Sequence, residues 1–204
     1  MAELRGKVVL ITGAGKGAGR LLSLALAGHG AVIAANDISP LNVEEVVDQI
    51  ISQGGQARAY IEDVAKKVGA QYIIKQVEED FGQIDILINH ASVEPHVPLL
   101  EVDEWDWHRV LDVNLTGTFL MTQSAGRIMR ARGGGVIINL VTRTEGAQES
   151  RSGAAFVATM SGLAGFSRQA ARELSPYGIR VHAVENDADQ VVDRVMALLA
   201  GKKE

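Results

Sequence analysis

The sequence contains no cysteine. A chain without thiols forms no disulfide bonds and has no thiolate nucleophile, so disulfide-stabilised folds and cysteine-dependent enzymes are excluded. The first ten residues, MAELRGKVVL, also lack the apolar stretch of a secretory signal peptide. Together these two absences predict a cytoplasmic protein.

The sequence also lacks an excess of positive charge and long apolar runs. Its 20 Lys and Arg side chains are mixed with 25 Asp and Glu side chains, which gives a net charge of −5. No basic stripe is available to neutralise phosphates, so we expect no nucleic-acid partner. Glycine or charged residues interrupt every apolar run before it reaches the roughly 20 residues that span a bilayer, so we expect no membrane partner. No metal site is expected either, because the histidines lack the spacing of metal ligands. The histidines are His29, His90, His96, His108 and His182.

Short β-branched segments alternate with longer amphipathic segments along the 204 residues. This alternation is typical of βαβ units that build a parallel sheet, and the nearly continuous apolar character of each short segment indicates strands covered by helices on both faces. No linker or repeat divides the chain, so we predict one α/β domain over residues 1–204. The predicted strands are 7–12, 31–36, 57–62, 84–89, 135–141 and 179–184, and the main predicted helices are 40–53, 103–132, 152–175 and 188–200.

A glycine-rich turn, TGAGKGAGR, follows the first predicted strand. Its glycines, Gly13, Gly17 and Gly19, allow the backbone to turn sharply and to approach a pyrophosphate at the N-terminus of the next helix. Asp37 ends the second strand about 20 residues later, near the spacing at which a carboxylate binds the ribose hydroxyls of a dinucleotide. The carboxylate favours NAD(H) over NADP(H), although Lys16 in the turn would suit a 2′-phosphate. A purely structural turn is the alternative.

Several segments, in order, resemble the short-chain dehydrogenase/reductase family from Lys7 to about Val184, and within it the 3-oxoacyl-carrier-protein reductase group. The glycine spacing Thr-Gly-x-x-x-Gly-x-Gly is that of the family. DILINHAS resembles its Asn-Asn-Ala-Gly segment, with His90 and Ser92 as departures, and IEDVA resembles the segment that contacts adenine. The resemblance implies a doubly wound parallel sheet of the Rossmann type, with strand order 3-2-1-4-5-6. It also implies cofactor contacts from Gly13, Lys16, Gly17, Ala18, Gly19, Asp37, Asp63, Val64, Asn89 and Ala91.

The resemblance also locates the catalytic positions of the family. LDVNLTGTF puts the family's catalytic asparagine at Asn114, and GGGVIINLVT puts its catalytic serine at Thr142. The Tyr-x-x-x-Lys motif of the family falls on Phe156 and Met160, so both the proton-donating hydroxyl and the ammonium that lowers its pKa are missing. No tyrosine of the chain is followed by lysine four residues later. A positioned general acid contributes about 10²- to 10⁴-fold to a rate, so the expected loss is several orders of magnitude.

The C-terminal segment, ENDADQVVDRVMALLAGKKE, predicts one amphipathic helix where the family continues with a substrate-covering lid and a last strand. The sequence therefore predicts a fold without that lid and strand. We interpret the chain as a catalytically degenerate member of the family that binds NAD(H) and serves as a structural or regulatory subunit. The partner implied by the resemblance is a second copy or a related active subunit, paired through the helices at 103–132 and 152–175.

Two alternatives stay open at this point. The first is an active NAD(H)-dependent oxidoreductase of a carbonyl or alcohol substrate that uses a non-standard proton donor, for which His90, Arg143 and Glu145 are candidates. The second is a structural partner that binds no cofactor, because the missing ammonium at position 160 removes one contact to the nicotinamide ribose.

Overall fold

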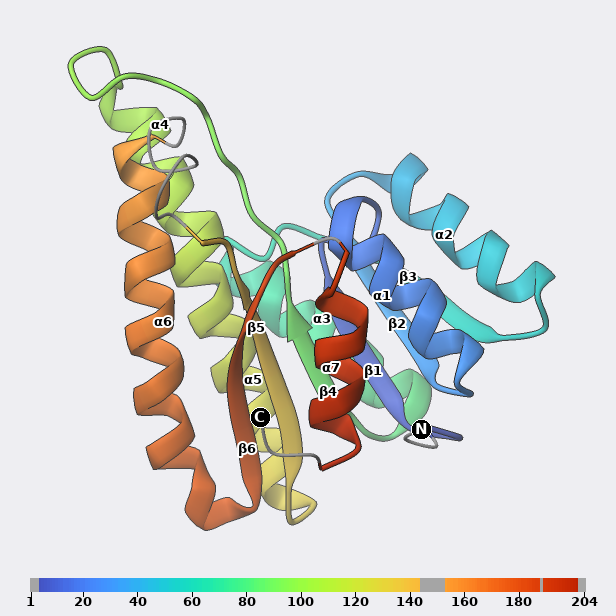
Figure 1. Ribbon diagram of the computed structural model, residues 1–204. Helices are drawn as coiled ribbons and strands as arrows, with labels where there is room; N and C mark the ends of the chain where they lie inside the picture. The colour runs from blue at the N-terminus through green and yellow to red at the C-terminus, as the bar shows by residue number, and fades with distance from the viewer. Residues whose placement is uncertain (1–3, 144–152, 188, 202–204) are drawn as a thin grey trace.

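The computed structural model describes residues 4–143, 153–187 and 189–201. Six strands form one parallel sheet in the order β3-β2-β1-β4-β5-β6, which confirms the predicted order (Figure 1). Within the described residues this sheet has no seventh strand. The strands are β1 (Val8–Thr12), β2 (Val32–Asp37), β3 (Gln56–Ile61), β4 (Ile86–Asn89), β5 (Gly135–Val141) and β6 (Ile179–Glu185).

The winding of the chain reverses between β1 and β4. β1 pairs with β2 on one side, with Val8 opposite Val32, and with β4 on the other side, with Val9 opposite Ile86. All the strands are parallel, so their carboxyl ends meet at one edge of the sheet. In doubly wound sheets, ligands bind at this edge, in the crevice opened by the reversal.

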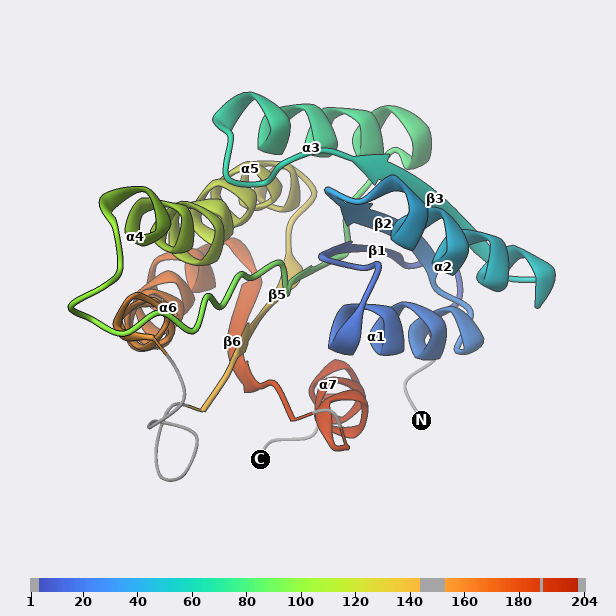
Figure 2. The same ribbon diagram turned by 90° about the horizontal axis from the view of Figure 1, so that it is seen from above.

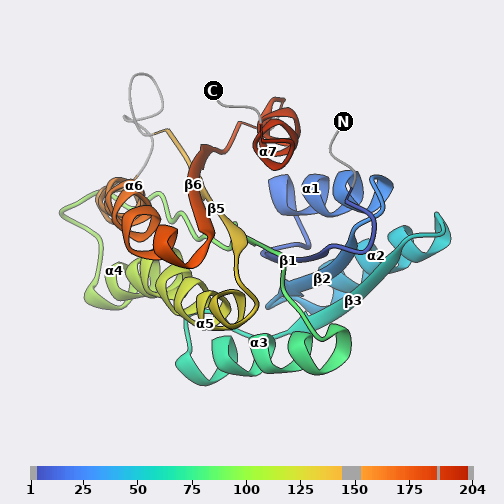
Figure 3. The same cartoon turned by 90° about the horizontal axis from the view of Figure 1, so that it is seen from below.

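Helices cover both faces of the sheet, as the two end-on views show (Figures 2 and 3). One face carries α1 (Gly17–Gly28), α2 (Pro40–Ser52) and α7 (Val191–Leu199). The other face carries α3 (Lys67–Phe81), α5 (Thr118–Ala131) and α6 (Ala154–Leu174). Within the residues described, no helix is long and apolar enough to cross a bilayer.

The strands are apolar on both faces because each face packs against helices. Along β1, Val9 and Ile11 contact the layer of α1, α2 and α7, whereas Val8 and Leu10 contact the layer of α3, α5 and α6. Successive side chains of a strand point to opposite faces, so a strand between two helical layers buries all of them. All five residues of β1 are buried.

The helix predicted over residues 103–132 consists of three segments. α4 (Glu104–Leu111) begins after Asp103, whose side chain accepts a hydrogen bond from the backbone N–H of Asp106 at 2.7 Å. A π-helical segment, η1 (Asp112–Gly117), follows and continues into α5. Single π-turns inside helices occur often at functional sites. Asn114, which the resemblance identifies as the catalytic asparagine, lies in this segment.

A third apolar cluster lies apart from the two cores of the sheet, between α4 and the first half of α6. Its buried members are Val110, Ala155, Phe156 and Met160. In Figure 1, α4 and the N-terminal turns of α6 extend past the carboxyl edge of the sheet. The cluster therefore packs beside the edge at which doubly wound folds bind ligands.

The last two predicted helices differ slightly from the observed ones. α6 begins at Ala154, and residue 152, where the predicted helix starts, lies outside the described residues. α7 begins at Val191 rather than near residue 188, which is also outside the described residues. α7 packs through Val191 and Val195 into the same core as α1.

Candidate functional site

The turn between β1 and α1 requires glycine at the three predicted positions. Gly13 and Gly17 have positive φ angles of 64° and 53°, which side chains of L-residues rarely adopt. A Cβ atom on Gly19 would lie 2.2 Å from the carbonyl oxygen of Gly13 and 2.7 Å from Nδ1 of His90. The backbone therefore turns too tightly for a side chain at Gly19, and Ala18 beside it is buried.

Asp37 holds the same turn from the end of β2. Its Oδ2 accepts a hydrogen bond from the backbone N–H of Gly15 at 2.9 Å, and its Oδ1 accepts one from the backbone N–H of Ser39 at 3.0 Å. Sequence reasoning missed Gly15, where a Cβ would lie 2.6 Å from Cβ of Asn42. The sequence has glycine at four positions from Gly13 to Gly19, which could have pointed to Gly15, but the glycine spacing of the family includes only the other three.

A cavity of about 310 Å³ opens over the carboxyl ends of β1, β2 and β3. It brings together six of the predicted cofactor residues, namely Gly13, Lys16, Asp37, Asp63, Val64 and Ala91. Its volume is at the lower end of the range for small-molecule sites. Sequence reasoning did not find Arg109 of α4, which lines the cavity and places Nη1 3.6 Å from Oδ2 of Asp63.

His90 forms the wall between this cavity and the second half of the edge. Its Nδ1 lies 3.0 Å from the carbonyl oxygen of Gly13, and because a carbonyl only accepts hydrogen bonds, the contact puts the proton of a neutral ring on Nδ1. Burial lowers the pKa of His90 below its usual value, although the hydrogen bond to Gly13 and the charge of Asp37 act in the opposite direction. The ring is therefore neutral near pH 7, with its one N–H donated to the turn.

The two asparagines predicted to act at the site make internal hydrogen bonds. Nδ2 of Asn89 donates to Oδ1 of Asn139 at 2.8 Å and to Oγ1 of Thr122 at 3.2 Å, and the residue is buried between β4 and β5. Asn114 binds the backbone of Val93 twice, with Oδ1 accepting from its N–H at 2.8 Å and Nδ2 donating to its carbonyl at 3.0 Å. Asn114 thereby fastens the segment after β4 to the π-helical turn.

Phe156 and Met160 lie on one face of α6, and both point into the third apolar cluster. They are 2% and 4% exposed. The backbone N–H of Thr142, the position matched to the family's serine, donates to Sδ of Met160 at 3.4 Å. The space beside them, lined by Asn114, Thr142 and Met160 among others, is about 10 Å³.

The other candidate proton donors lie away from this space or are already bound. Arg143 is paired with Glu185, with 2.8 Å between Nε and Oε1. Tyr60 is not a candidate, and its hydroxyl is also engaged, because it donates to Oδ2 of Asp80 at 2.7 Å; burial and this contact strongly raise the pKa of Tyr60. Glu145 lies outside the described residues. No cluster of His, Asp and Glu side chains that could hold a metal ion occurs in the part of the chain that the structure describes.

Comparison with known proteins identifies the family. A profile described as short chain dehydrogenase matches residues 7–188. An uncharacterized oxidoreductase of Thermotoga maritima is 40% identical over 182 residues, which cover 89% of this chain and 71% of the relative. A 3-oxoacyl-[acyl-carrier-protein] reductase of Synechocystis is 36% identical and is matched over 90% of this chain and 74% of its own length.

A solved structure shows the same arrangement of the backbone. The crystal structure of NAD⁺-bound xylitol dehydrogenase superposes with a TM-score of 0.85 at 32% sequence identity, over 90% of this chain and 70% of that one. The strand order of the sheet and the glycine turn after β1 are those expected of the family that these matches identify. The chain belongs to the short-chain dehydrogenase/reductase family and resembles its 3-oxoacyl-[acyl-carrier-protein] reductases.

Proposed function

We propose that this chain is a catalytically degenerate member of its family that binds NAD(H) and acts as a structural or regulatory subunit. The observation that carries the proposal is the pair Phe156 and Met160, which is apolar and buried where the resemblance expects a hydroxyl and an ammonium. When bound, a nicotinamide cofactor supplies hydride to a carbonyl carbon, and the carbonyl oxygen then needs a proton. Neither side chain has a proton to donate.

The nearby polar groups support the degenerate assignment over an active enzyme with a different acid. His90 is neutral and donates its N–H to Gly13, so a proton transferred from it would break the contact that holds the turn. The side-chain amide of Asn114 is engaged with Val93 and with the hydroxyl of Thr159, 3.2 Å away. That amide therefore serves the fold rather than a proton relay.

The cavity over β1 to β3 supports NAD(H) as the ligand rather than NADP(H). The carboxylate of Asp37 lies at the end of β2, and it would attract ribose hydroxyls and repel a 2′-phosphate. Lys16 lines the same cavity and would favour the phosphate, but Asp37 is held by two backbone N–H groups and Lys16 is exposed. The charge of Asp37 therefore has the larger effect, because its side chain is already ordered, whereas ordering the exposed side chain of Lys16 around a phosphate would cost conformational entropy.

The proposal is tested by assaying the purified protein with an acetoacetyl thioester and NADH. We expect no NADH oxidation above the blank, because a missing general acid alone costs about 10²- to 10⁴-fold. The Synechocystis 3-oxoacyl-[acyl-carrier-protein] reductase, assayed with NADH and with NADPH, is the positive control, and the purified protein is assayed with both cofactors as well. Steady turnover that disappears in Thr142→Ala would contradict the degenerate assignment.

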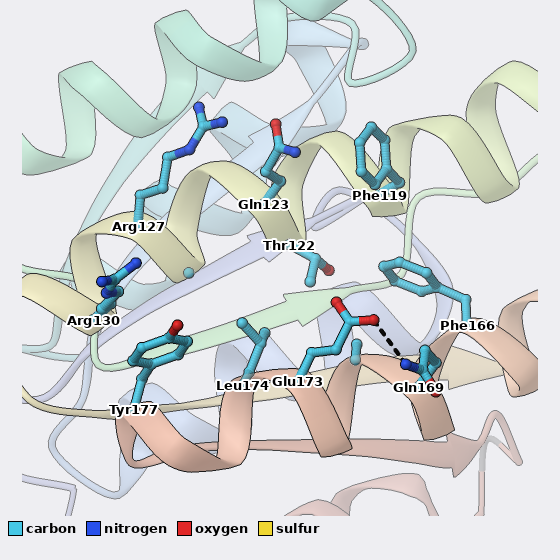
Figure 4. Close-up of a pocket in the computed structure, with 12 residues that line it drawn as sticks. Phe119, Thr122, Gln123, Arg127, Arg130, Phe166, Gln169, Glu173, Leu174 and Tyr177 are labelled. Carbon is cyan, nitrogen blue, oxygen red and sulfur yellow. Dashed lines mark hydrogen bonds between the residues drawn. The ribbon is translucent and has the colours of Figure 1, made fainter.

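We also propose that the outer face of α5 and α6 binds a second copy of the chain. The groove between these helices encloses about 370 Å³ (Figure 4). Phe119 and Phe166 meet edge to face across it, with 6.4 Å between ring centroids. The groove also carries both signs of charge, Arg127 on α5 and Glu173 on α6, and a face of this kind can be complementary to itself about a two-fold axis.

Phe119→Asp is expected to weaken the dimer at least tenfold, because it puts a carboxylate into the apolar part of the groove. Sedimentation velocity over a concentration series measures the change. Leu41→Asp is the matched control, since Leu41 is also an exposed apolar side chain but lies on α2, away from the groove. A monomeric wild type at tens of micromolar would contradict the second-copy proposal.

A cytoplasmic location and a single domain over residues 1–204 stay predictions.

A further inference from the structure

Two spaces of very different size lie along the carboxyl edge of the sheet. The first, about 310 Å³, lies over β1, β2 and β3. The second, about 10 Å³, lies over β4, β5 and β6, where Asn89, Thr142 and Asn186 mark the ends of the three strands. His90, Ala91 and Ser92 line both spaces, so the two are neighbours separated by one short segment.

A dinucleotide lies across the winding reversal of a doubly wound sheet, with one mononucleotide over each half. The glycine turn and the carboxylate that ends β2 belong to the first half, so the adenosine belongs over β1 to β3. The nicotinamide then belongs over β4 to β6. A space of about 10 Å³ holds about one water molecule and no aromatic ring. The residues fit the adenosine half and do not fit the nicotinamide half.

The second space is closed by contacts from three different elements. Met160 and Leu163 project into it from α6. Met160 is fixed at its sulfur by the N–H of Thr142, at the end of β5, and its side chain packs with Phe156 and Val110. These contacts come from both helix and strand, so rotating one side chain does not reopen the space.

The segment after β4 is fastened over the same region. Asn114 holds the N–H and the carbonyl of Val93, and the backbone of the segment at Pro95 approaches α6 so closely that a Cβ on Gly153 would lie 2.8 Å from the Pro95 carbonyl oxygen. Val93 also packs against the third apolar cluster. These backbone contacts hold the segment and α6 in place, so the free volume of the space depends on the side chains that project into it, and Met160 is one of them.

We propose that this chain is a receptor for the adenosine-diphosphate part of the cofactor, which binds ADP-ribose and NAD(H) equally and leaves the nicotinamide in solvent. The proposal rests on the proposed binding of NAD(H) at the glycine turn, and it adds that the reactive ring contributes nothing to affinity. The open cavity has the groups that such a ligand needs. Asp37 lies where the ribose hydroxyls would bind, and Lys16 of the glycine turn provides positive charge for the diphosphate.

Calorimetric titration of the wild type with NAD⁺, ADP-ribose and nicotinamide mononucleotide tests the proposal. We expect the dissociation constants of NAD⁺ and ADP-ribose to agree within about threefold, and no heat from nicotinamide mononucleotide at millimolar concentration. The fluorescence of bound NADH gives an independent readout, because a nicotinamide in water keeps the emission maximum of the free cofactor. NAD⁺ binding at least tenfold tighter than ADP-ribose, or a shifted NADH emission, would overturn the proposal.

Met160→Ala tests the cause of the closure. Removal of the thioether enlarges the space over β4 to β6, so we expect NAD⁺ to gain at least fivefold in affinity relative to ADP-ribose. Met129→Ala is the matched control, since Met129 is a buried methionine of α5 that lines neither space. The ratio of its affinities for NAD⁺ and ADP-ribose should stay at the wild-type value. A folded Met160→Ala protein with an unchanged ratio would contradict the closure by Met160. If Met160→Ala does not fold, the wild-type titration decides.

The outcomes separate this inference from the proposed function. Tighter binding of NAD⁺ than of ADP-ribose, with no turnover, would overturn the inference and leave the degenerate NAD(H)-binding subunit in place. No binding of any of the three ligands would overturn both. Equal binding of NAD⁺ and ADP-ribose by a protein that turns over an acetoacetyl thioester would contradict both, because hydride transfer requires the nicotinamide at the substrate.

Discussion

Gly19→Ala is expected to abolish nucleotide binding, with a loss of at least about 100-fold in affinity for NAD⁺ and for ADP-ribose, or about 2.7 kcal/mol. The new Cβ would lie 2.2 Å from the carbonyl oxygen and 2.9 Å from the carbonyl carbon of Gly13, and 2.7 Å from the ring of His90. The backbone and a buried ring must therefore move, and the turn that faces the ligand changes shape. Overpacking of this kind also destabilises the fold by about 1 to 3 kcal/mol.

The matched control for this substitution is Gly28→Ala, at the other end of the same helix. A Cβ on Gly28 has nothing within 4 Å. Alanine is a better helix former than glycine, so the control should bind nucleotide normally and gain up to about 1 kcal/mol in stability. Calorimetry and thermal melting measure both effects. A Gly19→Ala protein that binds and melts like the wild type would show that the turn is looser than the distances indicate.

The double variant Phe156→Tyr with Met160→Lys is expected to lose stability rather than to gain activity. It restores the family's two functional groups, but it puts an ammonium and a hydroxyl into a cluster whose members are at most 5% exposed. A buried ammonium without a carboxylate partner costs several kcal/mol, and an unsatisfied hydroxyl adds about 1 to 3 kcal/mol. We therefore expect the free energy of unfolding to fall by about 3 kcal/mol or more, as measured by urea denaturation.

The reductase activity of the double variant should stay at the blank level, because lysine is about as long as methionine and the space over β4 to β6 remains closed. Met160→Leu is the control for stability, since a volume-conserving apolar change costs less than about 1.5 kcal/mol. A double variant that is as stable as the wild type and reduces an acetoacetyl thioester would contradict this expectation. It would mean that the site has lost its proton donor but is otherwise intact.

Phe156 and Met160, the positions that the resemblance matches to the catalytic pair, also have a structural role. Phe156 and Met160 do more than omit a proton donor and a cation, because they join Val110 and Ala155 in an apolar cluster that fastens α4 to α6. Met160 also accepts a hydrogen bond from the backbone after β5. The two positions that the resemblance matches to the catalytic pair thus contribute here to packing.

The sequence alone determined the architecture and the first half of the site. Apolar runs buried on both faces specify a parallel sheet, and the positive φ angles of Gly13 and Gly17 can be anticipated from glycine at those positions. The position of Asp37 at this cavity follows from its place at the end of a parallel strand, whereas Asp63 is predicted from the family resemblance alone. Apart from Asp63, these features depend on local geometry and on periodicity, both of which are written in consecutive residues.

Only the tertiary structure decided the rest. Arg109 lies beside Asp63, Asn114 holds Val93, and Met160 fills the space over β4 to β6, and each of these contacts joins residues between 18 and 46 positions apart. No periodic pattern encodes such pairs, because the direction of a side chain at a π-helical turn and the volume left beside it depend on how α4, α6 and the segment after β4 pack together. The sequence shows which chemical groups the positions matched to the catalytic pair lack, and only the packing shows that the space over β4 to β6 is as small as about 10 Å³.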